Sequence, residues 1–417
     1  MKPLPSEIIS IIVHCLREMI NTDEGHSNWD PNPGPVWGLI RVWEPSNLAQ
    51  YSVISRQWQR SVEPFIWKRI CLLGPTQVFH LFRYTTGDDY RCARVGYIRH
   101  IFWQPCIVLP DKTDPIFHTN SNHPIFEWYD NQYHNELRHL FLVLHIWGKR
   151  NPGLELVLYH RSPEYKAFRP SEIRLLLRQE MIDFIHHVPQ SVGSLDLSVE
   201  GGREWSRRLH EDEVYHRRLT YLDHNGLDLL SIGLNTLSMR LRALTLSHMQ
   251  ISKALFWPSA ESSTNASYWP NLEQLQVLNM PPYDIDGSPL LDLDPPLTRE
   301  DLLLAIDGFS NRREYIKSAN MSVLYQAIGE AARQMPRLDS VCLSLLNFRT
   351  GEESRESLKF SRDKNARTAR LRINTQWEYR LGEEVISAWG LEGDVAEEFR
   401  RTMDVTLPWF VEPREDQ

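Results

Sequence analysis

The chain has 417 residues, of which 41% are hydrophobic and 24% are charged. This composition supplies enough apolar surface for a sizeable core and excludes a wholly disordered chain. The formal net charge of −8 disfavours a general nucleic-acid binder. No apolar stretch reaches the roughly 18 residues that a membrane span needs, and the N-terminus lacks a signal-peptide pattern. We therefore expect a cytoplasmic or nuclear protein without a membrane segment.

The N-terminal segment predicts a helix that begins near Pro5 and runs to about Met19. Proline suits the first turn of a helix, and Glu7 lies near the positive end of the helix dipole. Apolar residues fall on two stripes at helical spacing, one of them through Ile8 and Ile12. A small helical module needs one stripe for its own core. The other stripe is covered either by a partner chain or by the downstream domain.

Turn-forming residues then interrupt the helical pattern over residues 21–46, which predicts an inserted loop. The helical pattern resumes after Ser46, where Ser and Asn supply helix caps. A third helix is expected to begin at Ser55, with apolar residues that continue its pattern to Ile70. The first 72 residues therefore predict a short helical module.

Three segments carry a family resemblance: Leu4-Pro5-x-Glu7-Ile8-Ile9, Val53-Ile54-Ser55-Arg56-x-Trp58 and Trp67-Lys68-Arg69. In this order they resemble the F-box of fungal F-box proteins, over about 45 residues. The inserted loop departs from the family, whose first two helices are joined by a short turn. The resemblance implies binding to a Skp-family adaptor and, through it, to a cullin. The residues that match the motif are Leu4, Pro5, Ile8, Ile12, Leu16, Leu48, Val53, Ile54 and Trp58.

Not all of these nine residues can contact the adaptor, because some must form the module's own core, and the sequence does not sort them.

From about residue 90 to 417 the chain repeats a helical stretch, a turn and a short alternating strand. The clearest expected helices are Leu137–Trp147 and Ser322–Gln334. The strands are unevenly spaced and show no consensus with a ladder asparagine. We therefore expect an α+β protein: the helical module, then an irregular leucine-rich-repeat-like α/β solenoid, with an ordinary globular α/β domain as the alternative. The expected strands are Tyr97–Trp103, Leu154–Tyr159, Ser194–Val199, Arg242–Ser247, Leu272–Asn279 and Arg337–Leu345.

Two segments break this pattern. Residues 281–297 are acidic and proline-rich and predict a solvated loop, because they lack the full ligand set of a calcium loop. Residues 351–365 are charged and predict a second exposed loop. A helix is expected around Val395–Met403, where it would cap the end of the array. The basic run Lys359–Arg372 predicts a solvated loop and strand edge, with an acidic partner or phosphate as the alternative.

No catalytic signature is present. The chain lacks a Gly-x-Ser-x-Gly elbow, a P-loop, a His-Glu-x-x-His motif and paired cysteines. We expect no catalytic residue, cofactor or metal. The resemblance implies a non-catalytic substrate-recognition subunit of an SCF-type (Skp–cullin–F-box) ubiquitin ligase, with an unknown protein target. The alternatives are an F-box scaffold that ubiquitylates nothing and an enzyme of unrecognised family.

Overall fold

The computed structural model describes residues 8, 12, 55–105, 123–148, 153–161, 178, 181–182, 184–200, 222, 226–256, 268–282, 284–285, 288, 290–294, 314–317, 319–346, 353–363, 365, 367–391 and 398–409. The chain forms two compact units. Unit 1 comprises Met1–Val108, Gln132–Leu158 and Pro189–Val192, and unit 2 comprises Leu109–Asn131, Tyr159–Val188 and Gly193–Gln417. The inserted loop expected at about 21–46 lies outside the described residues, and the domain boundaries at 72 and 90 stay predictions.

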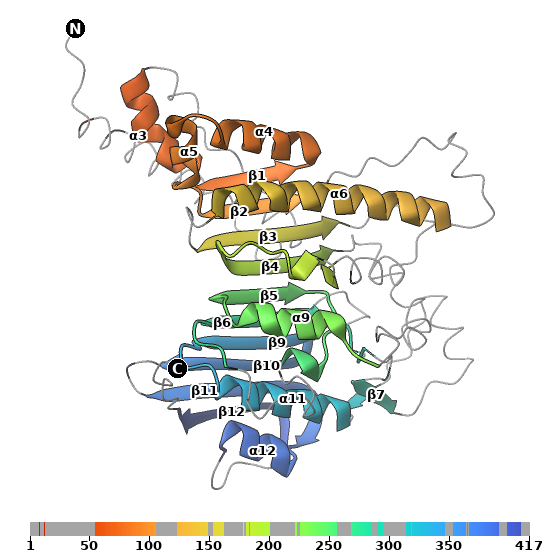
Figure 1. The fold of residues 1–417 in the computed structure, drawn as a ribbon. Helices are drawn as coiled ribbons and strands as arrows, with labels where there is room; N and C mark the ends of the chain where they lie inside the picture. The colour runs from red at the N-terminus through yellow and green to blue at the C-terminus, as the bar shows by residue number, and fades with distance from the viewer. Residues whose placement is uncertain are drawn as a thin grey trace. The chain divides into compact units, whose positions relative to one another are not determined.

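Unit 1 is built on parallel strands that are connected through helices (Figure 1). Strand β1 pairs in parallel with β2, and β2 pairs in parallel with β3. Parallel neighbours need a crossover connection, which α4 and α5 supply between β1 and β2, and α6 between β2 and β3. Its elements are α3 (Arg56–Ile66), β1 (Arg69–Leu73), α4 (Pro75–Thr85), α5 (Asp89–Val95), β2 (His100–Gln104) and the larger parts of α6 (His123–Trp147) and β3 (Leu154–Arg161).

The third helix ends earlier than the sequence predicted. The Ser55 hydroxyl caps α3 by accepting a hydrogen bond from the backbone N–H of Trp58 at 3.3 Å. The helix then ends at Ile66, and Ile70 lies in β1, where it pairs with Ile101. Extending the helix to Ile70 was therefore wrong, because the backbone of β1 finds its hydrogen-bond partners on β2. A short apolar run does not distinguish the end of a helix from a strand.

Unit 2 is built on a longer sheet in the order β4-β5-β6-β9-β10-β11-β12. Its first four strands are parallel to one another, whereas β9-β10, β10-β11 and β11-β12 are antiparallel pairs. Strands β7 and β8 form a separate antiparallel pair. The elements are β4 (Val192–Glu200), α9 (Leu229–Ser238), β5 (Ala243–Ser247), η4 (Lys253–Leu255), β6 (Gln274–Met280), β7 (Leu291–Asp294), β8 (Glu314–Lys317), α11 (Ala319–Ala332), β9 (Ser340–Leu346), β10 (Glu353–Asp363), β11 (Thr368–Arg380), α12 (Glu383–Trp389) and β12 (Glu398–Pro408).

The parallel strands of unit 2 share one apolar frame. Around β5, β6 and β9 the buried residues follow the pattern apolar-x-x-apolar-x-apolar: Leu241, Leu244 and Leu246; Leu272, Leu275 and Val277; Leu338, Val341 and Leu343. The middle residues are aligned by strand pairing, Leu244 with Leu275 and Leu275 with Val341. His248, directly after β5, and Asn279, the next-to-last residue of β6, both take a left-handed backbone with φ of 59° and 52°. These three strands therefore share one local pattern of buried residues despite their uneven spacing in sequence.

All six predicted strands are present with small shifts at their ends, but three other predictions for this region were wrong. Residues 351–365 do not form an exposed loop, because 353–363 are strand β10. Within the expected helix Val395–Met403, residues 398–403 instead belong to β12, which pairs with β11. Residues 291–294 of the expected loop 281–297 form β7. The charged side chains misled the prediction, since along β10 Leu358 and Phe360 are buried while Lys359 and Ser361 are exposed.

Helices α9 and α11 lie over the same face of the unit 2 sheet (Figure 1), and α12 packs against α11. Trp389 of α12 is buried, donates from Nε1 to the carbonyl of Tyr325 at 3.0 Å, and contacts the ring of Phe360 on β10. Gly329 on α11 permits this packing, because a Cβ at that position would lie 2.9 Å from the Trp389 indole. The apolar side chains of the sheet thus form a core with the helices, and the alternate side chains point to the opposite face.

Candidate functional site

Of the nine residues predicted to contact an adaptor, the structure describes three. Ile8 and Ile12 are helical; the Ile8 side chain is 43% exposed and that of Ile12 is half-buried. Their four-residue spacing places them on one helix face. Trp58, in the first turns of α3, is also half-buried. The other six, Leu4, Pro5, Leu16, Leu48, Val53 and Ile54, lie outside the described residues.

Helix α3, which carries Trp58, is anchored by a buried carboxylate. Glu63 Oε1 accepts hydrogen bonds from Nε and Nη2 of Arg94 at 3.2 and 2.7 Å. The Arg94 guanidinium also lies 5.0 Å from the ring centroids of both Trp67 and Tyr90. Sequence reasoning missed this cluster, because nothing in the local pattern relates Glu63 to an arginine on α5. It holds the third helix of the predicted module against the following helices.

The face of the unit 2 sheet opposite the core carries a continuous row of polar side chains. Successive Cα partners across the seven strands are Asp196, Thr245, Gln276, Cys342, Lys359, Arg372 and Asp404. The first four are half-buried and the last three are exposed. A parallel row runs through Ser194, Ala243, Gln274, Ser340, Ser361, Arg370 and Thr406. The described side chains of these two rows are mostly polar, and the cations among them lie on β10 and β11.

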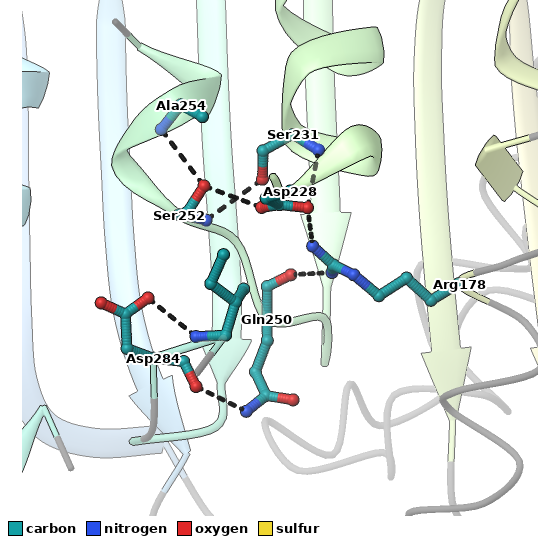
Figure 2. Close-up of polar contacts among 8 residues, drawn as sticks. Arg178, Asp228, Ser231, Gln250, Ser252, Ala254 and Asp284 are labelled. Carbon is teal, nitrogen blue, oxygen red and sulfur yellow. Dashed lines mark hydrogen bonds and ion pairs between the residues drawn. The ribbon is translucent and has the colours of Figure 1, made fainter. Parts of the chain in front are cut away.

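A buried polar network links connections between the strands of this sheet (Figure 2). Nη2 of Arg178 pairs with Asp228 Oδ1, and Nη1 donates to the carbonyl of Gln250 at 2.5 Å. Asp228 also caps α9 by accepting from the N–H of Ser231 at 3.1 Å, and it accepts from the Ser252 hydroxyl at 2.7 Å. Arg178 and Asp228 are 5% and 3% exposed. The pair is compensated by several hydrogen bonds, as a buried ion pair requires.

Beside this network lies a pocket of about 380 Å³, lined by residues next to α9, η4, β6 and α11. Its walls are mostly aliphatic, and its two carboxylates are those of Asp228 and Asp284. Asp284 Oδ1 accepts from the N–H of Ile285 at 2.7 Å, whereas Asp228 is bound by Arg178 and Ser252. Neither histidine nor cysteine lines it. The pocket is a mostly apolar cavity without a nucleophile–histidine pair in its lining.

The described residues contain no cluster of His, Cys, Asp or Glu that could hold a metal ion. None of their helices is long and apolar enough to cross a membrane. In comparisons with known proteins, no family model matches the chain, and no curated protein or solved structure shows significant similarity to it.

Proposed function

We propose that this chain is the substrate-recognition subunit of an SCF-type ubiquitin ligase. Its N-terminal helices bind a Skp-family adaptor, and the repeated strands of the second unit bind a target protein. The chain itself catalyses no covalent step. It raises the effective concentration of the target's lysines near the ubiquitin-carrying enzyme that the adaptor and cullin bring.

The observation that carries this proposal is the exposed apolar helix position at Ile8. An isoleucine that is 43% exposed on a helix whose next turn carries the half-buried Ile12 leaves apolar surface for a partner. The anchoring of α3 through Glu63 and Arg94 keeps Trp58 in a fixed place, as a docking surface needs. The shared apolar frame of β5, β6 and β9 supports a leucine-rich-repeat-like solenoid, whose helix-free face is the customary binding face of such arrays.

Replacing Ile8 with glutamate tests the adaptor interface. Because the side chain is exposed, the melting temperature should stay near that of the wild type, since surface substitutions cost little. Retention on an immobilised, purified Skp-family adaptor should fall by about tenfold or more, because a buried carboxylate would replace an apolar contact.

The matched control is Phe79→Glu on α4. Phe79 is 62% exposed and belongs to the same unit but not to the F-box-like segment, so this variant should bind the adaptor as the wild type does. Equal retention of Ile8→Glu and wild type would argue against the proposal. Recovery of a cullin and of ubiquitylated clients with the wild type would distinguish a ligase subunit from a scaffold.

A further inference from the structure

Two cations stand side by side on the exposed face of the unit 2 sheet. Lys359 of β10 and Arg372 of β11 are Cα partners in an antiparallel pair, and both side chains are exposed. Directly opposite residues in such a pair have Cβ atoms about 4.5–5.5 Å apart. Like charges in this arrangement repel and destabilise the sheet unless an anion offsets them.

The described part of the chain offsets these charges only in part. Asp404 is the Cα partner of Arg372, whose charge helps to lower the Asp404 pKa, but its two carboxylate oxygens accept from Nε and Nη2 of Arg370 at 2.7 and 2.6 Å. Arg372 donates from Nε to the neutral amide oxygen of Asn374 at 3.2 Å. Among the described residues Lys359 makes no ion pair. The one carboxylate of Asp404 is therefore shared by Arg370 and Arg372, and with Lys359 a net positive charge is left for a ligand.

The neighbours of this pair favour an extended ligand. On the β9 side of Lys359 the row continues through Cys342, Gln276 and Thr245, which are half-buried and uncharged. Strands are spaced by about 4.8 Å, so a segment laid across them meets one side chain of the row at each strand. The net charge of −8 for the whole chain disfavours a polyanion as long as nucleic acid.

We propose that Lys359 and Arg372 are the docking point for a carboxylate-rich segment of a partner protein. The segment lies across the polar row, with its carboxylates over the two cations and its backbone over Gln276 and Thr245. This inference rests on the proposed function for the identity of the partner as a target, but the binding itself involves neither the adaptor nor the N-terminal helices.

The test is fluorescence anisotropy of a fluorescein-labelled octaglutamate peptide titrated with the full chain at low salt. We expect saturable binding that weakens as salt is added. The double variant Lys359→Glu/Arg372→Glu should weaken the affinity by about tenfold or more, since it places like charges against the peptide. The matched control is Lys253→Glu, which reverses an exposed lysine of the same unit away from the row and should stay within about twofold.

Three outcomes would overturn the inference: no binding by the wild type, equal affinity in the double variant, or an equal loss in Lys253→Glu. Tighter binding of a single-stranded oligonucleotide through the same two cations would show that the ligand is a nucleic acid and not an acidic protein segment. If the double variant unfolds, the neutral single variants Lys359→Gln and Arg372→Gln must each weaken binding. All of these variants should bind the adaptor as the wild type does. If the wild type binds the peptide but not the adaptor, the proposed function is contradicted and this docking point is not.

Discussion

Replacing Asp228 with alanine should lower the free energy of unfolding by about 3–5 kcal/mol, the cost of breaking a buried ion pair. The substitution leaves the guanidinium of Arg178 buried without its carboxylate. It also removes the cap of α9 at Ser231 and the acceptor of the Ser252 hydroxyl. Urea unfolding followed by far-ultraviolet circular dichroism measures the loss.

The matched control is Asp404→Ala. Asp404 receives two short hydrogen bonds from Arg370, but both side chains are exposed, and exposed ion pairs contribute little to stability. The control should therefore unfold near the wild-type midpoint. A loss below about 1 kcal/mol for Asp228→Ala would mean that the network does not stabilise these connections of the sheet.

Acidification should destabilise the protein through His160. This side chain is 2% exposed in unit 2, and burial lowers its pKa from the ordinary 6.5 to about 3. Between these values the unfolded chain binds a proton that the folded protein does not. The contribution of neutral His160 to stability is therefore complete above pH 6.5 and is lost as the pH falls toward 3. From pH 7 to pH 5 this residue alone should cost about 2 kcal/mol.

The measurement is the difference in pH dependence between the wild type and His160→Gln, which keeps a hydrogen-bonding side chain but does not titrate. The variant should lose less stability between pH 7 and pH 5. The matched control for the loss of a histidine is His187→Gln, which removes an exposed imidazole of the same unit. Identical slopes for wild type and His160→Gln would show that His160 is not held neutral by burial.

Alternating aliphatic residues were sufficient to predict the strands with an apolar inner face, such as β5 and β6. The same rule failed at β10 and β12, because each has one exposed face rich in charged or polar residues. At β1 the apolar run fitted a helix as well as a strand, and only pairing with β2 decides between them. Local pattern therefore predicted the interior strands better than the final antiparallel ones.

The candidate sites were harder to predict than the strands. Arg178 and Asp228 are 50 residues apart, and Glu63 and Arg94 are 31 apart, so no local spacing relates them. The polar row across the sheet could not be aligned from sequence, because the connections between strands vary in length. Ile8, by contrast, was named from its match to the F-box motif, and it is exposed in the structure. What it contacts stays a prediction.

Hydrogen–deuterium exchange of the wild-type chain, with and without a purified Skp-family adaptor, tests the central proposal most directly. Adaptor binding should slow exchange in peptides that contain Ile8, Ile12 and helix α3, and should leave β10 and β11 unchanged. If no complex forms, or if protection is confined to the strands of unit 2, the chain is not an adaptor-bound recognition subunit.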